Sequence, residues 1–230
     1  MQYKVDYQSG RPVYRCHSDF GALDGTNINI FPKIVDFGLA TRLGKRSAPD
    51  GEAREQHGIY PIQPDHYRAP EVILGCRWDS KADIWNFGVL LWDILGSRGL
   101  FQQIHDTGGQ YNARSHLAEM VALLGPPPRE FVMKSKTMST LNWPEAIRND
   151  VGKLCKNAQE FPGGPFFDTE GEFCHSALIA SHNLSDTISF LEGKEREAFS
   201  SFVREMLTWR PEERKTARQL MEHPFLKLEN

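Results

Sequence analysis

The chain has 230 residues, enough for one domain of ordinary size with a sizeable buried core. Apolar residues make up 40% of it and charged residues 25%, a composition typical of a soluble globular protein. The formal net charge is −3, so the charge favours neither nucleic acid nor an anionic membrane as a partner.

The cysteines and the apolar stretches indicate an intracellular protein. No two cysteines form a CxxC pair, which predicts free thiols in a reducing compartment rather than a zinc site or a disulfide framework. The first residues, MQYKVDYQSGRP, do not resemble a signal peptide. The longest apolar stretch, residues 84–95, is too short to span a bilayer. We expect a soluble protein of the cytoplasm or the nucleus.

The first third of the chain predicts little regular structure. RPVYRC, at residues 11–16, predicts one short strand. FPKIVDF, at residues 31–37, predicts a second strand that ends in a turn at Gly38. Residues 41–66 are rich in Gly, Ser, Pro and charged residues, and we expect a long loop there.

From Ser80 the pattern becomes helical. Apolar residues lie at spacings of three and four on two neighbouring faces: Ile84, Phe87, Leu91 and Leu95 on one, and Trp85, Val89 and Trp92 on the other. A helix that is apolar on both faces is predicted to be central and buried. The glycines at 96 and 99 end it.

Three further regions complete the predicted helical domain. Ser115 is the expected N-cap of a helix that Gly125 ends. Residues 126–192 predict short helices joined by loops. In the last third, EAFSSFVREMLTW carries an apolar stripe, and Thr216 with Gln219 has the spacing of a capping box for a helix that stops at Pro224. We therefore expect one mainly α domain without internal repeats.

Four motifs occur in order along the chain. They are Asp36-Phe37-Gly38, Ala69-Pro70-Glu71, the D-x-W-x-x-G pattern from Asp83 to Gly88, and RPEERKTARQLMEHPF at residues 210–225. A lone DFG has little specificity, whereas four signatures in this order are specific. Together they resemble the C-terminal lobe of a eukaryotic protein kinase over residues 33–226. YRAPEVILG and the long insert resemble the branch of cyclin-dependent, MAP and SR-protein kinases, with the SR-protein-kinase-like members closest.

The resemblance implies a fold and its parts. The expected architecture is the mainly α large lobe of a kinase, with a few short strands at the N-terminus and no N-terminal β lobe. Residues 1–32 would be a partly irregular remnant and residues 33–226 the lobe itself. Within the lobe, the resemblance implies an activation segment at 36–71 and an insert at about 126–192.

The resemblance also assigns a cofactor site. Asp36, with Phe37 and Gly38, would bind the cofactors ATP and Mg²⁺, because Mg²⁺ prefers carboxylate oxygen. Gly38 would let the backbone turn without a Cβ clash. A bare DFG is also compatible with an ordinary junction between a strand and a turn.

Structural roles follow in the same way for five residues. Glu71 resembles a residue that pairs with a buried arginine, here Arg214, and so ties the activation segment to the lobe. Asp83 resembles a residue that holds the catalytic loop, or it serves only as a helix cap. Trp85 is expected in the core, and Gly88 is expected to have a structural role.

The segment GIYPIQPDHYRAPE, residues 58–71, would form a shelf for the peptide substrate. Its predicted site residues are Pro64, Tyr67, Arg68, Ala69, Pro70 and Glu71. Arg68 matches the basic residue of this branch and is expected to pair with an anion in the loop. Pro64 stands where the family has a Thr or Ser that contacts the catalytic Asp. Ser47 and Tyr60 carry the phosphorylatable hydroxyls of the activation segment, and the alternative is that both are unmodified surface residues.

Several parts of a kinase active site have no counterpart in these residues. Phosphoryl transfer needs a Gly-rich loop, a Lys on strand three with its Glu partner, and a catalytic loop with Asp and Asn. The weak candidate for the catalytic Asp is Asp19, in His17-Ser18-Asp19, but Gly21 and Asp24 replace the expected Lys and Asn. Asp19 is either part of a degenerate catalytic loop or an ordinary loop residue, and we favour the latter.

Two functions remain open. The first is a partial serine/threonine protein kinase domain that does not phosphorylate proteins by itself. The second is a pseudokinase module that binds a partner through the shelf or the insert. In both cases we expect a protein substrate or partner, and neither nucleic acid nor a membrane.

Overall fold

The structure is a computed structural model that describes residues 3–5, 12–14, 40–47 and 53–227. The chain divides into two compact units, Met1–Gly38 and Leu39–Asn230. The described residues of the first unit are an antiparallel hairpin of β1 (Tyr3–Val5) and β2 (Pro12–Tyr14). The strand predicted within residues 11–16 is thus confirmed, whereas the one predicted at 31–37 lies outside the described residues.

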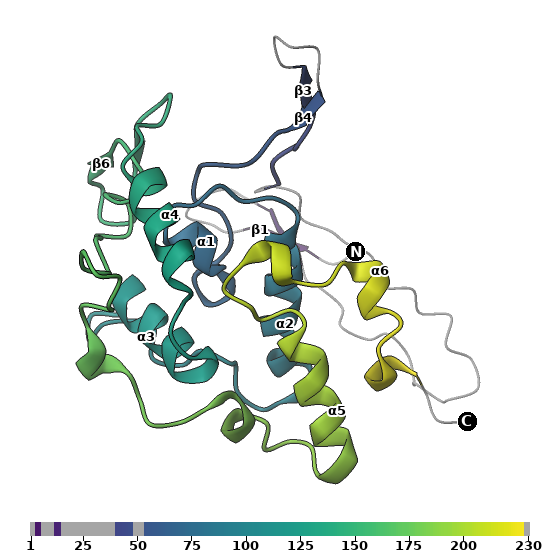
Figure 1. Cartoon of the computed structure of the whole chain (residues 1–230). Helices are drawn as coiled ribbons and strands as arrows, with labels where there is room; N and C mark the ends of the chain where they lie inside the picture. The colour runs from purple at the N-terminus through teal and green to yellow at the C-terminus, as the bar shows by residue number, and fades with distance from the viewer. Residues whose placement is uncertain (1–2, 6–11, 15–39, 48–52, 228–230) are drawn as a thin grey trace. The chain divides into compact units, whose positions relative to one another are not determined.

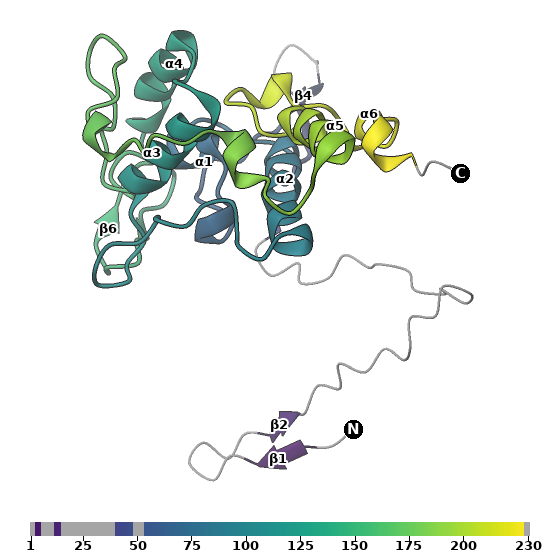
Figure 2. The ribbon, with the colours of Figure 1, turned by 90° about the horizontal axis from the view of Figure 1, so that it is seen from below.

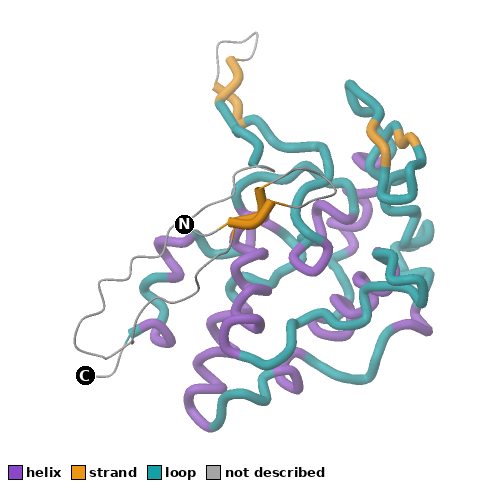
Figure 3. Tube along the Cα trace, turned by 180° about the vertical axis from the view of Figure 1, so that it is seen from behind, coloured by secondary structure: helices purple, strands orange, loops and turns teal. Residues whose placement is uncertain are grey.

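The second unit is mainly helical where it is described, as predicted (Figure 1). Its α-helices are α1 (Pro70–Ile73), α2 (Lys81–Leu95), α3 (Ala113–Leu124), α4 (Arg129–Ser139), α5 (Gly193–Arg204) and α6 (Ala217–Leu220). Its strands form two antiparallel hairpins, β3 (Lys45–Ser47) with β4 (Ala53–Glu55) and β5 (Ile147–Arg148) with β6 (Leu154–Cys155). Loops connect most of these elements (Figure 3). The first hairpin lies inside the predicted loop 41–66, which is therefore not entirely irregular.

Helix α2 is the centre of this unit. In Figures 1 and 2, α1 lies between α2 on one side and α3 and α4 on the other, while α5 and α6 lie beyond α2. Trp85, Val89 and Trp92 recur at helical spacing and are buried. The prediction that both faces are buried is wrong for the first face, because Phe87 and Leu95 are exposed, although Leu91 is buried. The 3.6-residue period turns the exposed side chains away from the row of tryptophans.

The C-terminal part packs directly onto α2. Phe199 and Phe202 of α5 are fully buried, and the Phe199 ring meets Trp92 edge-on with centroids 5.2 Å apart. A Cβ at Gly88 would lie 3.0 Å from Leu207, so glycine allows this close approach. This packing confirms the predicted apolar stripe. It also places Trp85 and Gly88 in the core.

The ends of α3 and α6 correct two predictions. Asn112, rather than Ser115, caps α3, because its side-chain oxygen accepts from the backbone N–H groups of Arg114 and Ser115. Both halves of the capping box between Thr216 and Gln219 are present at α6, as predicted. The helix ends at Leu220, before the predicted stop at Pro224, and only His223, the residue before the proline, has extended backbone.

A second, smaller apolar cluster lies in the insert. Its buried residues are Trp143, Cys155 and Ala158, and the shelf residues Ile59 and Tyr60 pack against it. The insert is thus joined to the segment that precedes α1.

None of the helices in the described part of the chain has the length and hydrophobicity that crossing a membrane requires.

Candidate functional site

Glu71 and Arg214 meet inside the second unit, although they are far apart in sequence. The two guanidinium nitrogens Nη1 and Nη2 donate to the two carboxylate oxygens over 2.7 and 2.6 Å. Both side chains are 0% exposed. This bidentate geometry is the strongest form of the arginine–carboxylate pair.

The remaining donors of Arg214 are also occupied. Nε and Nη2 donate to the carbonyl of Thr208, and Nη1 donates to the carbonyl of Lys81 over 2.9 Å. The guanidinium carbon lies 5.1 Å above the Trp85 ring. All five N–H groups of the guanidinium therefore have acceptors, which offsets the cost of burying the charge. The C-terminal end of the shelf is fastened to α2 and to the segment after α5.

Gln63 holds the middle of the shelf in an unusual backbone conformation. Its φ is +69°, in the left-handed region that residues other than glycine rarely adopt. Its side-chain amide donates to the carbonyl of Ala82 in α2 and accepts from the backbone N–H of Ala69, each over 2.9 Å. These bonds stabilise a conformation that is costly by itself.

Arg68 fixes the same turn from the other side. It donates to the carbonyl of Gln63 over 3.2 Å and forms a 2.9 Å ion pair with Asp65. Its guanidinium carbon lies 4.5 Å above the ring of Tyr111. The anion paired with Arg68 in the described residues is thus a shelf carboxylate. The backbone of residues 63–69 is held by side chains on both sides.

Tyr67 connects the shelf to the outer face of α2. Its hydroxyl donates to Asp93 over 2.5 Å, and this bond, together with burial, raises the pKa of Tyr67 to about 12. Since the pKa in the fold lies above the ordinary tyrosine pKa, Tyr67 contributes stability below about pH 10. That contribution is lost as the pH rises from about 10 to 12.

Substituting Asp93 tests this contact. In the variant Asp93→Asn, we expect the pKa of Tyr67 to fall toward its ordinary value, because the carboxylate no longer favours the protonated phenol. The Cζ chemical shift of labelled tyrosine, followed with pH, measures it. The pKa of Tyr111, raised to about 12 mainly by burial, is the internal control and should stay unchanged. An unchanged pKa for Tyr67 would contradict the assignment.

The N-terminal part of the shelf is bound by two tryptophans. Trp78 donates its indole N–H to the carbonyl of Tyr60 over 2.8 Å, and Trp143 donates to the carbonyl of Ile59 over 3.0 Å. The Tyr60 hydroxyl is bonded to the backbone of Glu145. Sequence reasoning missed these contacts, as well as Gln63 and Asp93. No local sequence pattern predicts a hydrogen bond between a side chain and a backbone group that is distant in sequence.

Gly58 packs closely against Trp78. Its backbone N–H and C=O both pair with Trp78, and a Cβ at Gly58 would lie 2.1 Å from the Trp78 indole. We expect Gly58→Ala to lower the free energy of unfolding by about 1–3 kcal/mol through overpacking, measured by urea denaturation. Gly44→Ala is the control, since its nearest contact would be 3.8 Å away. Equal losses in the two variants would contradict this explanation.

The other predicted site residues divide into two groups. Asp19, Asp36, Phe37 and Gly38 lie outside the described residues, and the side chain of Ser47 is likewise not described. Pro64 precedes the 3₁₀ turn Asp65–Tyr67, and Ala69 is the N-cap of α1, which begins at Pro70. Asp83 lies in the first turn of α2, where partial burial raises the pKa of its carboxyl group, and the N-cap of this helix is Ser80. Among the described residues, no cluster of three or more His, Cys, Asp or Glu side chains could hold a metal ion.

Comparison with known proteins gives one consistent result. Residues 23–226 match the protein kinase domain family. A serine/threonine protein kinase of Aspergillus fumigatus is 37% identical over 195 residues, which are 85% of this chain and 40% of the relative. The serine/threonine-protein kinase AFC3 of Arabidopsis thaliana is 29% identical over 203 residues, 85% of this chain and 41% of the relative. Human dual specificity protein kinase CLK4 is 28% identical over 233 residues, 98% of this chain and 37% of the relative. The chain spans about two fifths of the length of these relatives.

Proposed function

The chain belongs to the protein kinase domain family, with distant relatives in the CMGC branch, and we propose that it forms the substrate-binding side of a serine/threonine kinase domain. Within the branch we assign it to the neighbourhood of the SR-protein-kinase-like members. Kinases of this family use ATP with Mg²⁺ and act on protein substrates. Asp36, Phe37 and Gly38 are the residues that we expect to serve the nucleotide and the metal.

The observation that carries the proposal is the buried pair between Glu71 and Arg214. It fixes the end of the shelf to the helical body, and Gln63 and Arg68 fix the middle. A peptide must be held in one place relative to the phosphate donor for transfer to be fast. A shelf with a rigid backbone supports that function.

We further propose that these 230 residues do not transfer phosphate by themselves. They contain no Gly-rich loop and no VAIK-like lysine, and Asp19 lacks the Lys and Asn of a catalytic loop. Positioning and electrostatic terms worth several kcal/mol would be lost without those groups.

A partner-binding pseudokinase module is the second candidate. Pro64 favours it, since proline has no hydroxyl with which to contact a catalytic Asp. In that case the shelf and the insert would bind a protein without any transfer of phosphate.

Calorimetry of ATP binding to the purified chain, with and without Mg²⁺, tests the proposed inactivity. We expect no measurable binding. Micromolar, Mg²⁺-dependent binding would overturn it and would restore Asp19 as a candidate catalytic residue. A genomic sequence upstream of Met1 that encodes a VAIK-like Lys and an HxDLKxxN loop in frame would favour the kinase over the pseudokinase.

A further inference from the structure

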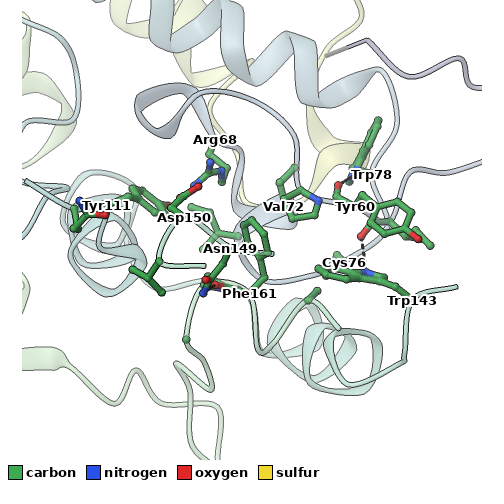
Figure 4. Close-up of a pocket in the computed structure, with 18 residues that line it drawn as sticks. Tyr60, Arg68, Val72, Cys76, Trp78, Tyr111, Trp143, Asn149, Asp150 and Phe161 are labelled. Atoms are coloured by element: carbon green, nitrogen blue, oxygen red, sulfur yellow. Dashed lines mark hydrogen bonds between the residues drawn. The ribbon is translucent and has the colours of Figure 1, made fainter. Parts of the chain in front are cut away.

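Two cavities lie where the insert packs against α1. The smaller one has a volume of about 200 Å³ and lies beside the rings of Tyr60, Trp78 and Trp143 (Figure 4). The larger one has a volume of about 500 Å³ and lies between α1, α4 and residues 158–169. Of the two, only the larger has the volume of a pocket that encloses a small-molecule ligand. It is therefore the better candidate for a binding site.

The inner side of the larger cavity is mostly apolar. The buried apolar residues that line it are Ile73, Leu74, Ala158, Phe166 and Phe167. Ser135 of α4 is also buried in the lining, but its hydroxyl donates to the carbonyl of Val132 in its own helix over 2.8 Å. A polar group placed against this side would lose hydrogen bonds to water. The inner side therefore favours a hydrocarbon group.

The opening of the cavity is polar and carries a lysine. Its exposed lining residues are Thr140, Pro165, Asp168 and Thr169. The ammonium group of Lys136 donates to the carbonyl of Asp168 over 2.7 Å, which uses one of its three donors. The Oδ1 atom of Asp168 accepts from the backbone N–H groups of Glu170 and Glu172, each over 2.9 Å. Lys136 can therefore still donate to an anionic group at the opening.

Hydrogen bonds hold the walls of the cavity in place. The backbone N–H of Gln159 donates to the carbonyl of Ser139 at the end of α4 over 3.0 Å. On the other wall, the N–H of Cys174 donates to the carbonyl of Phe166 over 2.9 Å. A ligand that enters a preformed cavity does not have to order the walls, and less binding free energy is lost.

We propose that this cavity binds a free fatty acid. The hydrocarbon chain lies against Leu74, Phe166 and Phe167, and the carboxylate accepts hydrogen bonds from the ammonium group of Lys136. The apolar inner side and the lysine at the opening match the two ends of such a molecule. This site lies outside the proposed kinase function, and its occupancy does not depend on phosphate transfer. Because α1 also carries Glu71, a bound chain would contact the short helix that Arg214 anchors.

Calorimetry with octanoate, decanoate and dodecanoate tests the site in the full 230-residue chain, below the concentrations at which these acids form micelles. We expect the affinity to rise about fourfold for each added CH₂ group, because each group leaves water for the apolar inner side. If none of the acids binds, the proposal is overturned. Equal affinities for the three acids would also overturn it, since the chain would not be buried.

A variant that fills the cavity locates the bound chain. Ser135→Leu places a larger apolar side chain in the lining and should weaken decanoate binding about tenfold or more. Thr137→Leu is the control, because Thr137 is exposed on the same helix and lies outside the lining. Thermal unfolding without ligand checks that both variants fold. Unchanged decanoate affinity in a folded Ser135→Leu variant would contradict the assigned position.

Two lysine variants, which leave the buried lining intact, test the head group. We expect the wild-type chain to prefer decanoate to decanol. Lys136→Met should abolish this preference, whereas Lys134→Met, which removes an exposed cation of the same helix outside the lining, should preserve it. A preference that survives in Lys136→Met would contradict the proposed pairing. Equal binding of decanoate and decanol by the wild-type chain would identify an uncharged ligand and overturn the assignment of a fatty acid.

Discussion

Replacing Arg214 by methionine is expected to lower the free energy of unfolding by about 3–5 kcal/mol, because the substitution leaves a buried carboxylate without a partner. Glu71 is 0% exposed, and each of its two carboxylate oxygens accepts a hydrogen bond from Arg214. The carbonyls of Thr208 and Lys81 lose donors in the same variant. Urea denaturation measures the loss.

A nearby arginine provides a matched control. Arg210 pairs with Glu130 over 3.1 Å, but the Glu130 side chain is 88% exposed. Arg210→Met should therefore cost only about 0–1 kcal/mol. If the two arginine variants are equally stable, the buried pair does not fasten the shelf.

The double variant Glu71→Met with Arg214→Met separates the attraction within the pair from the penalty of an unpaired charge. It removes both charges, so we expect it to be more stable than either single variant. A double variant that loses the sum of the two single losses would show that the hydrogen bonds matter more than the unpaired charge.

The sequence predicted those parts of the structure that rest on local rules. The tryptophan row of α2 follows from helical periodicity, and the start of α6 follows from the Thr216–Gln219 capping box. The motif resemblance named Glu71 and Arg214 as partners, and the structure brings them together. Each of these inferences uses either a short spacing or a signature with an assigned role.

Other features depend on contacts that no local rule contains. Gln63 has no intrinsic preference for positive φ, and it adopts this conformation because Ala82 and Ala69 bond its side chain. The bond from Trp143 to Ile59 joins residues that are far apart in sequence. The cap of α3 was misassigned because Asn112 and Ser115 both suit that role, and only the path of the chain selects between them.

Truncating Trp85 to alanine is expected to lower the free energy of unfolding by about 3–5 kcal/mol, which would identify it as a core residue. The side chain is 0% exposed, and its ring stacks on Phe101 with centroids 6.3 Å apart. The truncation leaves a cavity at the centre of α2. It also removes the ring beneath the Arg214 guanidinium.

The control lies on the same helix. Ile94 is 61% exposed, so Ile94→Ala should change the stability by no more than about 0.5 kcal/mol. The indole N–H of Trp85 is buried and has no hydrogen-bond partner among the described residues, so Trp85→Phe loses no such bond and should cost less than alanine. A phenylalanine variant as unstable as the alanine variant would contradict this expectation. Since Trp85 and Arg214 are in contact, the free energies of unfolding that the two single variants lose should not add up in the double variant. Additive losses would show that Trp85 does not contribute to holding Arg214 in place.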